Sequence, residues 1–262
     1  YWMSGPNKEL FDVNFKDWRS DPEQLFNIDK IPNPVLRATH RQSKKRLLAY
    51  ANSQLSKALD INTLTIGFAR RAATYKRAQL IFKDVDRLID IGKGKIQIIF
   101  SGKAHPKDEG GKSLIKNIVK NSKYFTGHIK IIYLENYNMW LGRLITSGVD
   151  VWLNTPLRPN EASGTSGMKA SLNGVPNLSV LDGWWSEGCI DGVNGWAVGN
   201  PNEISDESDA DHLYNLIENN VIPSYYGDKD DWSTMMKESI KTGISYTSHR
   251  MVTDYNNQYY KL

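Results

Sequence analysis

The chain alternates short apolar runs with stretches of helical periodicity, and this alternation restricts its fold more than any other feature. The apolar runs, predicted to be strands, lie at residues 64–68, 96–100, 129–134, 149–153 and 178–181. The helical stretches lie at residues 78–91, 112–120, 139–147 and 166–173. Strands that alternate with helices form βαβ units, and continuously apolar strands are typical of parallel sheets covered on both faces. We therefore predict an α/β fold with a doubly wound, Rossmann-like parallel sheet.

Three segments are distinguished along the chain. Residues 1–60 are polar and charged, and their clearest helical pattern covers 41–59, after expected breaks at Pro32 and Pro34. Residues 61–205 form the predicted Rossmann-like core. Residues 206–262 turn acidic and then helical, and we expect helices of the same domain, packed on the sheet or on a separate lobe.

Composition restricts the class of protein. The 262 residues are 40% hydrophobic and 24% charged, which is enough for one large domain with a real core. The net charge of +4 gives no reason to expect nucleic acid but suits a phosphate site. No apolar run approaches the roughly 18 residues of a membrane helix. Cys189 is the single cysteine, which excludes an internal disulfide and fits a reducing cytoplasm.

Two further features bear on metals and on the chain start. His105 and His128 have no clustered partners in the sequence, so we predict no metal site. Because the first residue is Tyr1, we expect that the natural amino terminus is missing.

Four cations follow the first predicted strand, namely Arg70, Arg71, Lys76 and Arg77. Ligands of doubly wound sheets bind at the loops after the strands, and arginine and lysine are the usual partners of phosphate. If this run opens a helix, Arg70 and Arg77 share a face. Charge alone favours a solvated basic helix over a phosphate site.

A glycine-rich turn follows the predicted strand at 149–153. Gly164 and Gly167 permit tight turning, and Thr165 and Ser166 offer hydroxyls that can cap the next helix. Free N–H groups at a helix start favour an anion, and Lys169 is placed to act as an ion partner or an imine-forming nucleophile. As a bare pattern, a structural cap is the more common explanation, and the pattern is not a P-loop.

Four segments in order resemble the α-glucan (glycogen or maltodextrin) phosphorylase family. They are residues 71–77, 101–106, 134–137 and the glycine-rich signature at 161–174. The Ser166-Gly167 version of the signature and the Trp184-Trp185 pair resemble the archaeal and bacterial branch.

The resemblance implies a reaction and a cofactor. This family implies a two-lobed glycosyltransferase fold of the B type, of which this chain would be the carboxyl-terminal lobe. It also implies reversible phosphorolysis of α-1,4-glucan by inorganic phosphate to glucose 1-phosphate, with pyridoxal phosphate (PLP) as cofactor. The catalytic positions would be Arg71, Lys76 and Lys169, with PLP held in a Schiff base on Lys169.

The resemblance also assigns binding roles. The expected cofactor-binding residues are Lys169, Thr165, Ser166, Tyr137, Arg70 and Lys76. The expected substrate-binding residues are Arg71 for phosphate, and Glu161, Ser163 and Gly164 for the glucosyl hydroxyls. Arg70 stands where many relatives have lysine, and Asn138 stands where many have arginine. The Trp184-Trp185 pair leaves the preferred length of the glucan chain open.

Two alternatives remain beside the phosphorylase. One is a nucleotide-sugar glucosyltransferase of the glycogen-synthase type, which would give Lys169 no reason to exist. The other is a non-catalytic module that binds glucan or a partner lobe. Without the amino-terminal lobe, we expect weak cofactor binding and little turnover. A homo-oligomer is compatible with the sequence.

Overall fold

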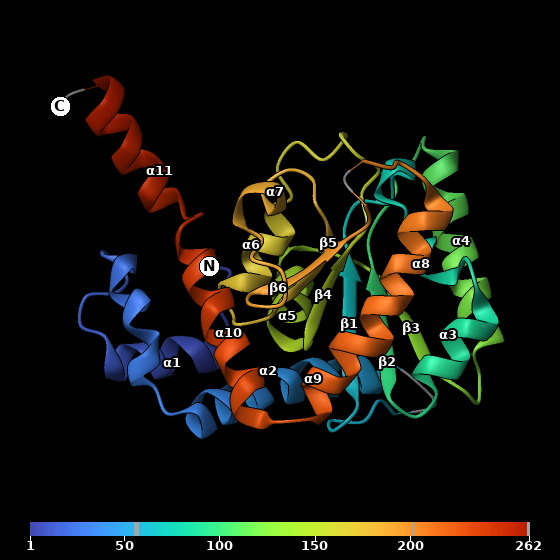
Figure 1. Cartoon of the computed structure of the whole chain (residues 1–262), viewed down its shortest axis with the longest axis horizontal. Helices are drawn as coiled ribbons and strands as arrows, with labels where there is room; N and C mark the ends of the chain where they lie inside the picture. Colours follow the sequence, from blue (N-terminus) through green and yellow to red (C-terminus); the bar gives the residue numbers. More distant parts are fainter. Residues whose placement is uncertain (55–57, 201, 261–262) are drawn as a thin grey trace.

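The computed structural model describes residues 1–54, 58–200 and 202–260. Its centre is a six-stranded parallel sheet in the order β3-β2-β1-β4-β5-β6 (Figure 1). The strands are β1 (Leu64–Ala69), β2 (Ile96–Ser101), β3 (Lys130–Leu134), β4 (Val151–Asn154), β5 (Asn177–Val180) and β6 (Gly195–Val198). This confirms the predicted doubly wound α/β fold. The strand order reverses between β1 and β4, where such sheets bind ligands beyond the carboxyl ends of the strands.

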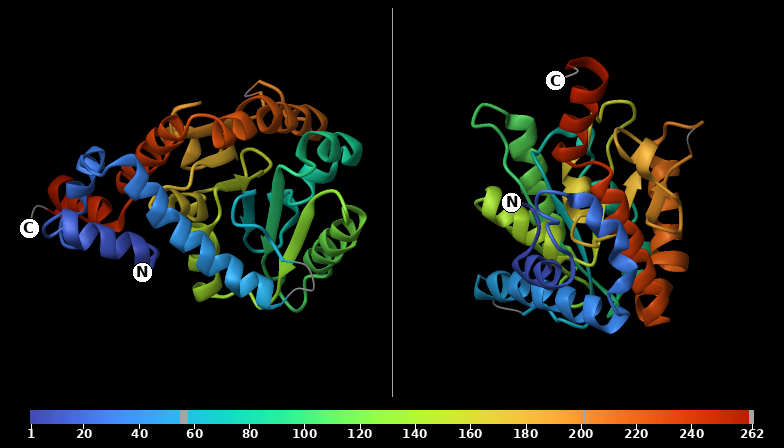
Figure 2. Two further views of the ribbon diagram at one scale, coloured as in Figure 1. Left: turned by 90° about the horizontal axis from the view of Figure 1, so that it is seen from below. Right: turned by 90° about the vertical axis from the view of Figure 1, so that its left-hand side faces the viewer.

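Successive strand residues point to opposite sides of the sheet, and helices cover both sides, so both faces are buried. In β2, Ile98 and Phe100 belong to one apolar core, whereas Ile99 belongs to the other. The helices that bury the Ile99 face are α2 (Asn33–Ser53), α5 (Met139–Gly148) and α6 (Thr165–Ser171). Those contributing to the other core include α3 (Val85–Gly92), α4 (Glu109–Tyr124), α8 (Asp206–Leu216) and α10 (Lys229–Ile244). Figure 2 shows these layers from two further sides.

The remaining elements are short helices and the two ends of the chain. They are α1 (Gly5–Asn14), η1 (Pro22–Lys30), η2 (Thr74–Lys76), η3 (Leu80–Phe82), α7 (Trp185–Gly188), η4 (Ile217–Val221), α9 (Ile222–Tyr226), α11 (Ser248–Tyr255) and η5 (Asn256–Tyr260). Helix α10 packs against η1, α6 and α2, which ties the two ends of the chain together. Helix α11 buries none of its residues and extends from the body (Figure 1). Within the described ranges, no helix has the length and apolar character needed to cross a membrane.

Two predicted helices differ from the observed ones, and one strand was missed. The helix predicted at 41–59 begins at Asn33, because Pro34 occupies its first turn, where the missing N–H has no intrahelical partner to lose. It ends at Ser53, and residues 55–57 of the prediction lie outside the described ranges. The helix predicted at 78–91 is divided into η3 and α3, because Asp84 caps α3 by accepting from Arg87 N. Strand β6 was not predicted.

Candidate active site

The loop after β1 is fixed by the turn after β2. Arg70 N donates to Ser101 O at 3.2 Å, and Ala72 N donates to Lys103 O at 2.9 Å. Gly102 is required in this turn because a Cβ there would come within 2.2 Å of the Arg70 carbonyl oxygen. The 101–106 segment therefore sets the position from which the Arg70 side chain enters the site.

Two cations converge on one carboxylate at the point where the strand order reverses. Arg70 Nη2 lies 2.7 Å from Glu161 Oε2, and Lys76 Nζ lies 2.5 Å from the same oxygen. The three side chains are between 6% and 9% exposed. Arg70 Nη1 also donates to the Asn154 side chain at the end of β4. Burial lowers the pKa of Arg70, although the Glu161 carboxylate opposes this change. The cluster therefore places three charged groups where little solvent reaches them.

Glu161 is held by the turn after β5. Its backbone N donates to Asp182 Oδ2 at 2.8 Å, and Trp184 N donates to Ser163 O at 2.8 Å. Gly183 has φ +55°, and a Cβ there would lie 2.5 Å from Ser163 O. The sequence resemblance used the Trp184-Trp185 pair as a sign of the branch, and the structure shows that Trp184, together with Asp182, anchors the loop of Glu161.

The glycine-rich turn begins α6 differently from the prediction. Gly164 is the N-cap residue, with φ +88°, and no side chain caps the helix. The predicted capping by Thr165 and Ser166 is therefore wrong, because both lie in the first turn of α6. Ser166 Oγ is buried and has no partner among the described residues. A Cβ on Gly167 would lie 2.8 Å from Trp184 Nε1, so the buried indole packs directly on the turn.

Lys169 lies further along α6, and its side-chain amine contacts an aromatic ring. Its Nζ is 3.7 Å from the centroid of the Trp2 ring, and Trp2 O accepts from Asn173 Nδ2 at 3.1 Å. Burial lowers the pKa of the Lys169 amine. Within the described ranges, no ion pair joins Lys169 to Glu161. Trp2 was missed by sequence reasoning, since nothing near it indicates a contact with such a distant segment.

Two predicted positions lie at the rim of the site. Tyr137 is half-buried, and burial raises its pKa although the nearby Arg70 opposes the change. Arg71 is exposed. Asn138, the position where many relatives carry arginine, is the N-cap residue of α5 and accepts from Leu141 N at 2.9 Å.

Arg77 does not share a helix face with Arg70, and that expectation is wrong. The residues between them form a loop and the short helix η2, and Arg77 itself has φ +45°. Its guanidinium is buried and donates to Asp209 Oδ2 at 2.6 Å and to Thr155 O at 3.0 Å. Arg77 therefore fixes the loop after β4 to helix α8 and takes no part in the cluster at Glu161.

Comparison with known proteins decides the family. The sequence model of the family described as carbohydrate phosphorylase matches residues 2–187. The chain belongs to the carbohydrate phosphorylase family. This phosphorylase chain is 43% identical to a maltodextrin phosphorylase of Thermococcus litoralis, over 99% of the chain and 34% of that protein. It is 42% identical to a glycogen phosphorylase of Aquifex aeolicus, over 99% of the chain and 42% of that protein. It is 43% identical to a glycogen phosphorylase of Mycobacterium tuberculosis, over 79% of the chain and 25% of that protein.

The phosphorylase chain thus spans less than half the length of these relatives. The described residues contain no group of three or more His, Cys, Asp or Glu side chains that could hold a metal ion. The candidate site therefore consists of the cations and the carboxylate after β1 and β4, together with the amine on α6.

Proposed function

We propose that this chain is the carboxyl-terminal, PLP-carrying lobe of an α-glucan phosphorylase that converts α-1,4-glucan and inorganic phosphate to glucose 1-phosphate. The observation that carries the proposal is the convergence of Arg70 and Lys76 on Glu161 at the switch point of the sheet. We also propose that the rest of the enzyme forms a facing lobe and that it works in the cytoplasm. The division into segments 1–60, 61–205 and 206–262 stays a prediction.

The cations supply what a phosphate substrate needs. Arg70 and Lys76 are nine-tenths buried, where each charge interacts more strongly than in water. The exposed Arg71 adds a third cation at the entrance. Glu161 neutralises part of this charge while no phosphate is bound. An incoming phosphate then takes over the cations as a stronger, multidentate acceptor, and the Glu161 carboxylate becomes available to other donors.

Glu161 and its neighbours are suited to sugar hydroxyls. Both cation contacts fall on Oε2, and no donor from residues 1–54, 58–200 or 202–260 lies at Oε1. A carboxylate oxygen accepts hydroxyl donors, and the exposed Ser163 hydroxyl stands beside it in the chain. With Gly164, these residues would orient the terminal glucosyl unit next to the phosphate.

The residues around α6 fit PLP. Lys169 has an amine whose pKa is lowered by burial, so a larger share of it is in the neutral form required for covalent attachment. Ser166 offers a buried hydroxyl without a partner among the described residues, Thr165 offers a second hydroxyl, and Tyr137 and Trp2 offer aromatic surface. When bound, PLP supplies a phosphate monoester whose second pKa of about 6 permits proton exchange near neutrality.

The proposal is tested by reductive labelling. The purified chain is incubated with PLP, reduced with borohydride and digested, and the modified peptide is located by mass spectrometry. We expect selective modification of Lys169, which a nucleotide-sugar glucosyltransferase would give no reason to expect. Labelling spread over exposed lysines such as Lys123, both with this chain and with the full-length enzyme, would contradict the proposal. A phosphorolysis assay on the same two samples then separates a half-enzyme from a glucan-binding module.

A further inference from the structure

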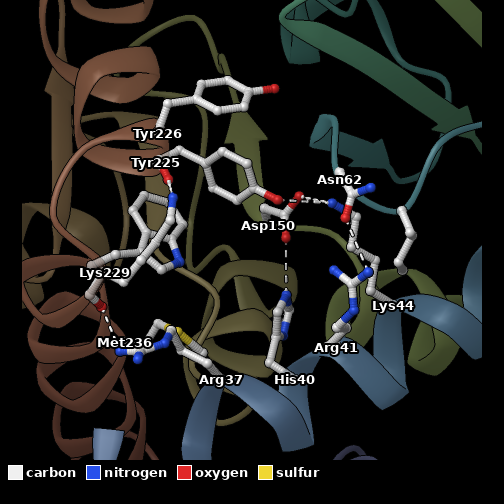
Figure 3. Close-up of a pocket in the computed structure, with 12 residues that line it drawn as sticks. Arg37, His40, Arg41, Lys44, Asn62, Asp150, Tyr225, Tyr226, Lys229 and Met236 are labelled. Atoms are coloured by element: carbon white, nitrogen blue, oxygen red, sulfur yellow. Dashed lines mark hydrogen bonds and ion pairs between the residues drawn. The ribbon is translucent and has the colours of Figure 1, made fainter. Parts of the chain in front are cut away.

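A cavity lies at the amino-terminal ends of the central strands, at the opposite end of the sheet from the candidate active site. It has a volume of about 360 Å³ and is enclosed by α2, α9, α10 and the segment that leads into β1 (Figure 3). Asp150, which lines it, directly precedes β4, whose other end carries Asn154 of the active site. The cavity therefore opens under the amino-terminal ends of β1 and β4.

The floor of this cavity is a buried ion cluster. Asp150 Oδ2 lies 2.5 Å from Lys44 Nζ, and Oδ1 lies 3.1 Å from His40 Nε2 (Figure 3). Oδ2 also accepts from Thr65 N at 2.7 Å. Burial opposes ionisation, but Lys44 and His40 hold the pKa of Asp150 below its ordinary value. Both carboxylate oxygens are thus engaged, and the single charge of Asp150 is already matched by Lys44.

The walls carry more positive charge than the floor can balance. Arg37, Arg41 and Lys44 follow each other at spacings of four and three residues and share one face of α2, where like charges repel. Arg37 has a partner in Asp230. Arg41 donates to the neutral amide of Asn62 at 3.0 Å, and Lys229, on the opposite wall, donates to a backbone carbonyl. Within the described ranges neither Arg41 nor Lys229 has a carboxylate partner.

Beside these cations stands an aromatic wall. The rings of Tyr225 and Trp232 meet edge to face with centroids 5.2 Å apart, and Met236 lies next to them. The ammonium groups of Lys44 and Lys229 each lie 5.4 Å from the centroid of the Tyr225 ring. Apolar surface and positive charge therefore meet around one space, which is the usual composition of a site for a small ligand.

We propose that this cavity is a second ligand site, which takes a small phosphate monoester attached to a ring. A phosphate monoester carries nearly two negative charges at neutral pH and matches the two cations that lack carboxylates, whereas a carboxylate would match one. The guanidinium of Arg41 offers two parallel N–H donors to the phosphate oxygens, and Lys229 binds the phosphate from the opposite wall. The ring of the ligand packs on Tyr225 and Trp232.

Calorimetric titration with phenyl phosphate tests the site, because this probe has one phosphate and one ring. The double variant Arg41→Gln/Lys229→Gln removes the two cations without touching the buried floor. The matched control, Lys116→Gln/Lys120→Gln, removes two exposed cations from α4, which does not line the cavity. We expect the first variant to weaken phenyl phosphate binding at least about tenfold, since it removes two charge-assisted hydrogen bonds, which are stronger than bonds between neutral groups. The control should bind like the parent.

A third variant separates this site from the active site. Arg71→Gln removes a cation of the candidate active site, at the carboxyl-terminal ends of the strands. It should leave in place the part of the phenyl phosphate binding that depends on Arg41. In that background, the binding component that depends on Arg41 and Lys229 should take inorganic phosphate more weakly than phenyl phosphate, because inorganic phosphate lacks the ring. Identical titrations of the Arg41→Gln/Lys229→Gln variant and its control, with equal thermal stabilities, would overturn the proposal. So would equal affinity for the two probes.

Discussion

The ammonium group of Lys169 lies 3.7 Å from the centroid of the Trp2 ring, which joins helix α6 to the start of the chain. An aromatic face attracts the charged amine, but burial disfavours charge. Burial lowers the pKa of Lys169, and the Trp2 ring, in contact with the amine, contributes to this burial. Burial thus gives the Lys169 amine a larger neutral share than an exposed lysine has at the same pH.

The first prediction concerns the pH dependence of labelling at Lys169. Only a neutral amine attacks an aldehyde, and a lowered pKa means that the neutral form is reached at a lower pH. Labelling by limiting PLP and borohydride should therefore rise with pH at Lys169 before it rises at the exposed Lys123. Quantitative peptide mass spectrometry across neutral to alkaline pH measures both curves. In Trp2→Ala, which exposes the amine, the Lys169 curve should move toward that of Lys123; coincident curves in the parent would contradict the argument.

The second prediction concerns Glu161→Gln. The substitution leaves Arg70 and Lys76 buried without their carboxylate, so the free energy of unfolding should fall by about 3 kcal/mol. Inorganic phosphate should restore more stability to this variant than to the parent, because the freed cations bind it and ligand binding to the folded state stabilises it. Denaturant unfolding with and without phosphate measures both effects.

The exposed pair of Glu109 and Lys112 provides the control for Glu161→Gln. These side chains are 80% and 47% exposed, so Glu109→Gln should change the free energy of unfolding by less than about 1 kcal/mol. A phosphate response in Glu161→Gln no larger than that of the parent would show that Glu161 does not compete with phosphate for the cations.

The sheet could be predicted from the sequence because buried parallel strands need continuous apolar runs. Strand β2 was expected at 96–100 and is found at Ile96–Ser101. Strand β6 gave no such signal, since Gly195 and Ala197 make up half of its four residues and it forms by pairing with β5. The helix expected at 78–91 was interrupted by the cap at Asp84, a local hydrogen bond that apolar periodicity does not report.

The site could be predicted in part from the direction of the strands. Parallel strands end at one edge, so residues after β1 and β4 had to meet there, and Arg70, Lys76 and Glu161 do. The position of Arg77 could not be predicted, because its left-handed backbone breaks the helical spacing on which the expectation rested. The contact of Trp2 with Lys169 depends on the packing of the first residues on α6, which leaves no local pattern.

The third prediction compares two aspartates that bind the same arginine. Asp209 is 1% exposed and accepts from Arg77 at 2.6 Å and from Arg158 at 3.1 Å, whereas Asp206 is 48% exposed and accepts from Arg77 at 2.8 Å. Asp209→Asn leaves the largely buried Arg158 without its carboxylate and Arg77 with only the half-exposed Asp206, and should lower the free energy of unfolding by about 3–5 kcal/mol. Asp206→Asn should cost less than about 1 kcal/mol. Equal losses in urea unfolding would mean that burial does not determine the strength of this network.

The fourth prediction concerns Gly102→Ala, which places a methyl group where the Arg70 carbonyl oxygen lies. The new Cβ would come within 2.2 Å of that backbone atom, so the loop after β1 must move, at a cost of about 1–3 kcal/mol in the free energy of unfolding. Since Arg70 begins this loop, its pairing with Glu161 should weaken, and stabilisation by inorganic phosphate should fall with it.

Gly110→Ala is the matched control, because that glycine is exposed in the first turn of α4 and its Cβ would meet only Asp108 Oδ1, at 3.4 Å. Alanine suits a helix better than glycine, so this variant should be as stable as the parent or slightly more stable, with an unchanged response to phosphate. If Gly102→Ala keeps the phosphate response of the parent, the turn after β2 is a packing contact and does not position Arg70 for phosphate.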